Sequence, residues 1–249
     1  MHTVLQVKDV TKIYKKGQRP SLHKVSFQVC EGEFIGIMGA SGSGKTTLLN
    51  VLSTIDKPTG GDVYLNNINL KSLTDTHAAD FRRDHLGFIF QEYFLLDSLT
   101  IRENISVPLT LKKLPPDKIE TMVTDLAKRF GIASQLEKYP NELSGGQRQR
   151  ASAARAIVKH PGLLFADEPT GALDSSSATE LLEALKEANS VLNTTILMVT
   201  HDPYAASFAS RIFLFKDGCI FRELHREKAD RRRFYEQIVD EVAKLDTDR

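Results

Sequence analysis

The sequence predicts an α/β fold in which a mainly parallel sheet is covered by helices, with an antiparallel β subdomain and an inserted helical subdomain. Short apolar runs typical of strands alternate with helical patterns along much of the chain. A glycine-rich loop joins the apolar run 34–38 directly to the helical run 46–52. Between residues 100 and 160 strand patterns vanish and helical spacing dominates, which indicates an insertion into the sheet domain.

The composition is that of an ordinary globular protein. Of the 249 residues, 41% are hydrophobic and 26% are charged, and the formal net charge is +1. This near-neutral balance gives no support for a nucleic-acid partner bound by bulk charge. No apolar run approaches the about 18 residues that span a bilayer, and the N-terminus lacks the pattern of a secretion signal. We therefore expect a cytosolic protein whose two cysteines are reduced.

The strand and helix patterns follow one another in a clear order. Residues 2–10 alternate between apolar and polar side chains and predict an edge strand. A helix is expected after Pro115, and Gly131 marks its end. Apolar runs predict further strands at 25–29, 34–38, 63–65, 86–90, 163–166, 195–199 and 212–215.

These patterns suggest one domain over residues 1–221, with the helical subdomain inserted at about 95–160. Residues 222–249 form a charged extension for which we expect a helix. Phe234, Ile238, Val242 and Leu245 recur there at helical spacing, so we expect this stripe to dock on the domain. The alternative is a solvated charged helix or a frayed end.

A phosphate-binding motif occupies the glycine-rich loop. Residues 39–46 fit the pattern G-x-x-x-x-G-K-[ST], which identifies a P-loop NTPase core. Glycines let consecutive N–H groups point at phosphate oxygens, and the following helix adds the positive end of its dipole. Lys45 suits the β- and γ-phosphates, and the Thr46 hydroxyl suits Mg²⁺. The expected nucleotide contacts of this segment are Gly39, Ser41, Gly42, Ser43, Gly44, Lys45, Thr46 and Thr47.

Two carboxylates follow the apolar run 163–166. A buried strand end is a costly place for paired charges unless a cation or a reaction needs them. Asp167 suits Mg²⁺, and Glu168 suits the activation of an attacking water. A solvated turn is the alternative, because Pro169 follows, but the phosphate loop upstream makes that alternative much weaker. His201 and Gln91 also follow apolar runs, so we expect both at the sheet edge where open α/β sheets bind ligands. The alternative for each is an ordinary turn residue whose hydrogen bonds are satisfied locally.

A second anion site is indicated at residues 143–147, Leu-Ser-Gly-Gly-Gln, which open a helical run. A serine and two glycines at a helix start offer a hydroxyl and free N–H groups to an anion. Since the chain already has a phosphate loop for its own nucleotide, this site suggests contact with the nucleotide of another subunit.

The ordered set of phosphate loop, Gln91, residues 143–147, residues 163–168, residues 172–174 and His201 resembles an ATP-binding-cassette (ABC) transporter ATPase. The resemblance implies that ATP and Mg²⁺ are bound between two copies of the chain arranged head to tail, and that ATP is hydrolysed there. Its implied catalytic residues are Glu168, His201 and Gln91, and its implied metal ligands are Thr46, Gln91 and Asp167. Its further nucleotide contacts are Tyr14, which would stack on adenine, with Ser144, Gly145, Gly146, Gln147 and the interface residue Asp174.

Residues 53–61, 94–100 and 166–174 are similar to the bacitracin-exporter group, which serves antimicrobial-peptide resistance and sensing. The resemblance implies an integral-membrane permease as partner, with the Gln91 segment beside it, and a location at the cytoplasmic face of the membrane. Because residues 94–99 follow Gln91 and carry apolar side chains, we expect them to touch the permease. The alternative is that they are buried within the helical subdomain. The substrate stays open, as does export of a peptide against its release from a lipid target. The alternative functions are lipoprotein release, macrolide export and cell division.

Overall fold

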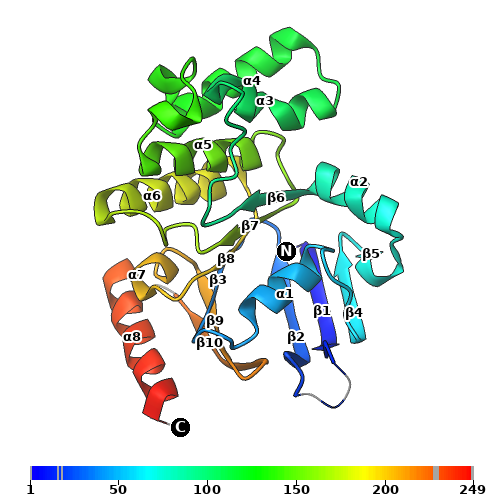
Figure 1. The fold of residues 1–249 in the computed structure, drawn as a ribbon. Helices are drawn as coiled ribbons and strands as arrows, with labels where there is room; N and C mark the ends of the chain where they lie inside the picture. Colours follow the sequence, from blue (N-terminus) through cyan, green and yellow to red (C-terminus); the bar gives the residue numbers. More distant parts are fainter. Residues whose placement is uncertain (1, 16, 18, 227–229, 248–249) are drawn as a thin grey trace.

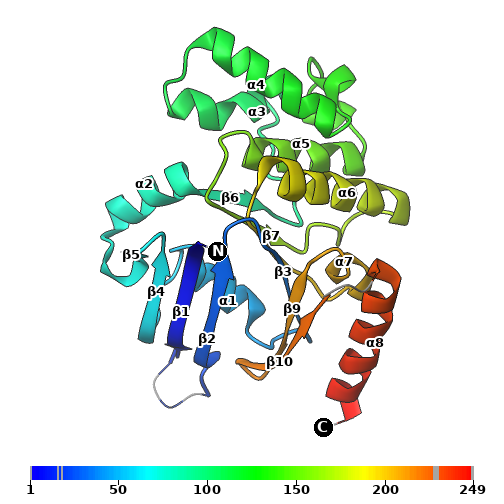
Figure 2. The same ribbon diagram turned by 180° about the vertical axis from the view of Figure 1, so that it is seen from behind.

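A computed structural model describes residues 2–15, 17, 19–226 and 230–247, with side chains described up to residue 244 in the last range. Two sheets form the centre of the molecule, a four-stranded sheet in the order β2-β1-β4-β5 and a six-stranded sheet in the order β10-β9-β3-β8-β7-β6. Figures 1 and 2 show α3 and α4 at one end of the molecule and α8 near the other.

The six-stranded sheet is parallel except for β10, which confirms the predicted mainly parallel sheet. Because parallel strands end at one edge, the loops after β3, β6, β7 and β8 share that edge. Its strands are β3 (Phe34–Gly39), β6 (Leu86–Ile89), β7 (Leu163–Asp167), β8 (Ile196–Val199), β9 (Arg211–Lys216) and β10 (Cys219–His225).

Both faces of this sheet are buried, which explains why its strands are continuous apolar runs in the sequence. In β7, Leu163 and Phe165 pack in the core shared with α1 (Lys45–Leu52) and the four-stranded sheet. Leu164 and Ala166 point the other way, into the core shared with the helical subdomain.

The four-stranded sheet is antiparallel, as predicted for a β subdomain. Its strands are β1 (Thr3–Lys12), β2 (Leu22–Cys30), β4 (Gly60–Leu65) and β5 (Ile68–Asn69). The prediction of an edge strand at residues 2–10 was wrong, because β1 lies between β2 and β4. An antiparallel sheet with one solvated face alternates in its central strands as well as at its edges, so alternation alone cannot place a strand.

The predicted helical insertion is present as three helices and two short 3-10 turns. Pro116 is the first residue of α4, and α5 begins directly after Ser144. The elements are α3 (Ile101–Leu111), α4 (Pro116–Arg129), η2 (Ala133–Gln135), η3 (Pro140–Glu142) and α5 (Gly145–Ile157). Before the insertion lie η1 (Leu70–Ser72) and α2 (Asp75–His85), neither of which was predicted from the sequence.

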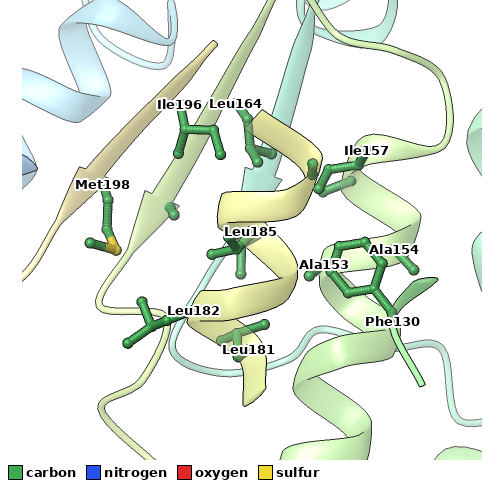
Figure 3. Packing of buried hydrophobic residues seen from close by; sticks show 14 of the residues in the cluster. Phe130, Ala153, Ala154, Ile157, Leu164, Leu181, Leu182, Leu185, Ile196 and Met198 are labelled. Carbon is green, nitrogen blue, oxygen red and sulfur yellow. The ribbon is translucent and has the colours of Figure 1, made fainter. Parts of the chain in front are cut away.

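The insertion is held to the sheet by α6 (Ser175–Leu192), which lies between α5 and the strands (Figure 3). Leu182 and Leu185 of α6 pack toward Ile196 and Met198 of the sheet. On the other side Ala153 presents a small side chain, so that α5 approaches α6 closely. Residues 144–147 at the start of α5, named the signature segment from here on, are therefore connected to the sheet through α6.

The C-terminal extension folds as α8 (Arg231–Thr247) after β10, which continues to His225. Phe234 and Ile238 are fully buried against α7 (Pro203–Ala206) and the sheet, and Val242 packs beside them. This part of the predicted stripe does dock. The side chain of Leu245 lies outside the described residues.

Candidate functional site

The phosphate loop connects β3 to α1 with the geometry that its glycines require. Gly44 has φ +106° and lies so close to the carbonyl of Ser21 that a Cβ would be 2.4 Å from that oxygen. A larger residue would strain the backbone and push the loop away from β2. The loop backbone thus turns at Gly44 directly into the N-terminus of α1.

The predicted residues of four separate segments meet in one pocket of about 540 Å³ at the carboxyl edge of the six-stranded sheet. The pocket combines a helix N-terminus, a lysine, two carboxylates, hydroxyl groups and an imidazole. It is lined by Ser21, Ser41, Gly42, Gly44, Lys45, Thr46, Thr47, Gln91, Asp167, Glu168, Val199 and His201. Gly39 and Ser43 instead line an adjoining cavity of about 340 Å³, on which Val242 of α8 also borders.

Lys45 lines the pocket and is buried. Its Nζ donates to the carbonyls of Gly39 (2.7 Å) and Ala40 (2.8 Å) within the loop. Burial lowers the pKa of Lys45, while the charges of Glu168 and then Asp167 act in the opposite direction. A bound polyphosphate would add negative charge here and so favour the protonated amine.

Asp167 is the last residue of β7 and Glu168 is the first residue of the loop after it. Burial is the main reason why the pKa of Asp167 is raised, followed by repulsion from Glu168, with Lys45 opposing both. Glu168 has a left-handed backbone with φ +46°, while its N–H donates to the carbonyl of Val199 at 2.9 Å. Such a conformation costs about 1–3 kcal/mol in a residue with a Cβ, and it persists only where the surrounding structure holds it.

The residues expected to hold Mg²⁺ line the same pocket and offer the ligand chemistry that this ion prefers. Thr46, Asp167 and Gln91 supply a hydroxyl, a carboxylate and an amide oxygen. No group of three or more His, Cys, Asp or Glu among the described residues could hold a metal by itself. Mg²⁺ is usually held by one or two carboxylates together with waters and substrate phosphates rather than by a protein cage.

The segment 144–147 is organised by a capping box at the start of α5. The Ser144 hydroxyl accepts from the N–H of Gln147 (3.3 Å), and the Gln147 carboxamide accepts from the N–H of Ser144 (3.0 Å). Gly146 lies so close to Ser177 that a Cβ on this glycine would be 2.5 Å from the serine hydroxyl.

Asp174 caps α6 on the other side of this contact and accepts from the N–H groups of Ser176 and Ser177, both at 3.0 Å. These bonds, led by that from Ser177, hold the pKa of Asp174 below its usual value. Sequence reasoning missed Ser177; the available signal was Asp174 itself, because an aspartate before a helical run fits an N-cap that accepts from the N–H groups two and three residues later.

Three parts of the predicted site are not brought to the pocket within one chain. Residues 144–147 and Asp174 do not line it. Tyr14 is 54% exposed and lies beside Lys12, whose Nζ is 4.9 Å from the ring centre. Their contacts with nucleotide therefore stay predictions, and those of 144–147 and Asp174 require a second copy.

Comparison with known proteins finds a matching family model and similar chains. The family model described as ABC transporter matches residues 22–171. The chain is 49% identical to the "Bacitracin export ATP-binding protein BceA" of Halalkalibacterium halodurans, across 95% of this chain and 94% of that protein. It is also 49% identical to the "ABC transporter ATP-binding protein YxdL" of Bacillus subtilis, across 98% and 95% of the two chains.

A solved structure shares the fold. It is the dimeric post-hydrolysis state of the ATP-binding cassette MJ0796 of Methanocaldococcus jannaschii, bound to ADP and Pi. Its TM-score to this chain is 0.80 with 39% sequence identity, and the match covers 89% of this chain and 98% of that one.

Proposed function

The chain belongs to the ABC transporter family, and from this premise we propose that it is the ATPase subunit that drives a permease for resistance to bacitracin-like antimicrobial peptides. It binds and hydrolyses ATP, as its family and its nucleotide-bound structural relative show. The observation that carries the peptide-resistance role is the 49% identity to a bacitracin-export subunit along nearly the whole chain.

The pocket supplies a separate part for each task of phosphoryl transfer. Lys45 and the loop N–H groups would bind the phosphates, and the first turn of α1 adds its dipole. Thr46, Asp167 and Gln91 would hold Mg²⁺, which offsets phosphate charge when it is bound. Glu168 would orient the attacking water and accept its proton, and His201 would hold Glu168 in place.

The nucleotide site is expected to be completed by a second copy of the chain. Ser144, Gly146 and Gln147 stand at a helix N-terminus that does not border the chain's own pocket. A partner placed head to tail would bring this anion site to the open side of the phosphates, with Asp174 near the interface. Tyr14 would stack on the adenine from its exposed position at the end of β1.

The permease would be contacted through the segment after Gln91. Phe94 and Leu96 are 60% and 49% exposed there. Neighbouring exposed apolar side chains of this size are typical of protein interfaces. Within the described residues no helix has both the length and the apolar character needed to cross a bilayer. Since the proposed permease is the integral-membrane partner, we place the subunit at the cytoplasmic face of the membrane, held there by that permease.

The proposal is tested by growth of a bacitracin-sensitive bacterium that expresses the chain with the permease encoded beside it. We expect the wild-type pair to raise the bacitracin concentration that stops growth. The same pair with Glu168→Gln is the matched control and should not protect. If both pairs behave like the empty vector while the purified wild type hydrolyses ATP, the peptide-resistance role is wrong and another ABC function applies.

A further inference from the structure

Helix α5, which begins at the signature segment, carries a buried glutamine that joins two loops of the nucleotide pocket. Gln149 is 0% exposed. Its Nε2 donates to the carbonyl of Phe90 at 2.8 Å and to the carbonyl of Pro169 at 2.7 Å. Phe90 directly precedes Gln91, and Pro169 directly follows Glu168. One carboxamide therefore holds the backbone beside two proposed site residues.

The two loops are neighbours, so a shift of the backbone in one loop would displace the other. They leave the adjacent parallel strands β6 and β7, in which Ile89 lies opposite Ala166. The side chain of Gln91 then packs on Gly171, where a Cβ would be only 3.1 Å from the Gln91 Cδ. Gln149 donates to both loops from the same nitrogen and so fixes their spacing.

Helix α5 also contacts the segment after Gln91 through two arginines. The guanidinium of Arg155 donates to the carbonyls of Phe94 (2.6 Å) and Tyr93 (3.0 Å), while that of Arg148 lies 5.0 Å from the centre of the Tyr93 ring. Among these contacts, that of Gln149 alone also reaches the Glu168 loop. A displacement of α5 would thus be transmitted to both sides of the pocket through Gln149.

Packing alone does not explain a glutamine at this position. Its Oε1 is buried without a hydrogen-bond partner, and such an atom costs stability. A methionine has nearly the same length and would fill the space without that cost. The two N–H groups are what a methionine cannot provide, and both are directed at the loops of the pocket.

We propose that Gln149 is a positioning residue that fixes the places of Gln91 and Glu168 relative to the signature segment. This inference rests on the proposed site for Mg²⁺ and ATP. Through Phe90, Gln149 fixes where the Gln91 carboxamide stands, and through Pro169 it fixes the strained backbone of Glu168. In each copy, α5 would then connect the signature segment, which faces the nucleotide of the partner, with the two loops that line the copy's own pocket.

The test measures magnesium dependence in a form that does not turn over. In Glu168→Gln protein, we would titrate Mg²⁺ at fixed ATP and follow dimer formation by size-exclusion chromatography. Adding Gln149→Met should raise the half-saturating Mg²⁺ concentration by about tenfold or more, the usual effect of losing a partner that orients a metal ligand. Added to Gln91→Ala, the same change should have little further effect, because the ligand it positions is already gone.

Gln135→Met is the matched control. Gln135 also has a buried, unpartnered Oε1, but it lies in η2 of the helical subdomain and does not line the pocket. Its magnesium titration should equal that of the parent. Gln149→Asn serves as a second variant, since it keeps an amide but withdraws it by one methylene, and it should shift the titration in the same direction.

An unchanged magnesium requirement in both Gln149 variants would overturn the proposal. So would the loss of folding in both variants while Gln135→Met stays folded, because Gln149 would then be structural only. Failure of the Glu168→Gln parent to dimerise with Mg²⁺ and ATP, together with wild-type protein that shows no magnesium-dependent hydrolysis, would instead contradict the proposed site. The two failures are therefore distinguishable.

Discussion

Glu168 and His201 are in direct contact although 33 residues separate them in the chain: Nδ1 of His201 is 3.0 Å from Oε2 of Glu168. The backbone N–H of His201 also points to this oxygen at 3.4 Å. The contact exists because β7 and β8 are neighbouring parallel strands, with Asp167 opposite Val199. The carboxylate is thereby held at the pocket wall, which is the position that its proposed role in orienting the attacking water requires.

Glu168→Gln should reduce ATP hydrolysis by about 10²–10⁴-fold, the usual contribution of a positioned acid or base. The substitution keeps the size of the side chain but removes the proton acceptor. Nucleotide should still bind, because Lys45, Thr46 and Asp167 are unchanged, and the variant should accumulate as an ATP-dependent dimer. Phosphate release and size-exclusion elution with and without Mg·ATP measure both effects. Turnover at the wild-type rate would show that another group activates the water.

His201→Ala should lower hydrolysis while leaving ATP affinity close to that of the wild type. The imidazole lines the pocket and supports Glu168, so its loss frees the carboxylate without removing a phosphate-binding group. Rates and nucleotide binding measured on the same preparation separate the two quantities. Equal losses in rate and affinity would place His201 in binding rather than in support of Glu168.

The local motifs could be recognised in the sequence because their chemistry lies within a few consecutive residues. The phosphate loop and the 163–168 segment each combine an apolar strand with the polar residues directly after it, and both occur where expected. The features that the sequence concealed depend on partners distant in the chain. The central place of β1 is decided by β4, and the two loops joined by Gln149 are 59 and 20 residues from it.

Helix α2 shows a different limit. Only Ala78 and Phe81 are buried in it, so its sequence lacks the apolar stripe by which a helix is recognised. Thr74 caps its start by accepting from the N–H of His77. At its other end, Lys159 donates to the carbonyls of Arg82 and Arg83. Such distant side-chain contacts are invisible in a one-dimensional pattern.

Asp167→Asn should raise the melting temperature of the nucleotide-free protein at neutral pH. Burial, followed by repulsion from Glu168, raises the pKa of Asp167. A carboxyl with a higher pKa in the folded than in the unfolded state favours folding at low pH and loses that contribution as pH rises through the folded value. At neutral pH the charged Asp167 therefore opposes folding.

The gain from Asp167→Asn should shrink as the buffer is made acidic, because wild-type Asp167 then takes up its proton. Stabilisation by Mg·ATP should be lost in the variant, since the proposed metal ligand is gone. Thermal unfolding with and without Mg·ATP, in neutral and in mildly acidic buffer, checks each point. A variant that melts below the wild type without nucleotide at neutral pH would contradict the assigned cost of this carboxylate.

Ile238→Asp should lower the free energy of unfolding by about 2 kcal/mol or more, because it places a charge where Ile238 is fully buried. Val239→Asp is the matched control: the neighbouring side chain is 38% exposed, so its effect should stay within about 0.5 kcal/mol. Denaturant unfolding of both variants makes the comparison. Equal stability of the two would mean that α8 does not dock in solution.

The proposed permease surface can be tested by crosslinking from Asp97. This residue lies between exposed Leu96 and the start of α3, on a segment whose backbone Arg155 fixes at Tyr93 and Phe94. A photoreactive residue substituted at Asp97 should therefore crosslink to the permease in membranes that contain both proteins. The photoreactive residue placed instead at exposed Asp240 on α8, which lies away from the helical subdomain (Figure 1), should give much less of this product.

The alternative is that the apolar residues of the segment after Gln91 only pack on their own domain, as Leu95 does in part. In that case Asp97 would capture no permease, or only a second copy of the chain, and the permease would have to dock elsewhere.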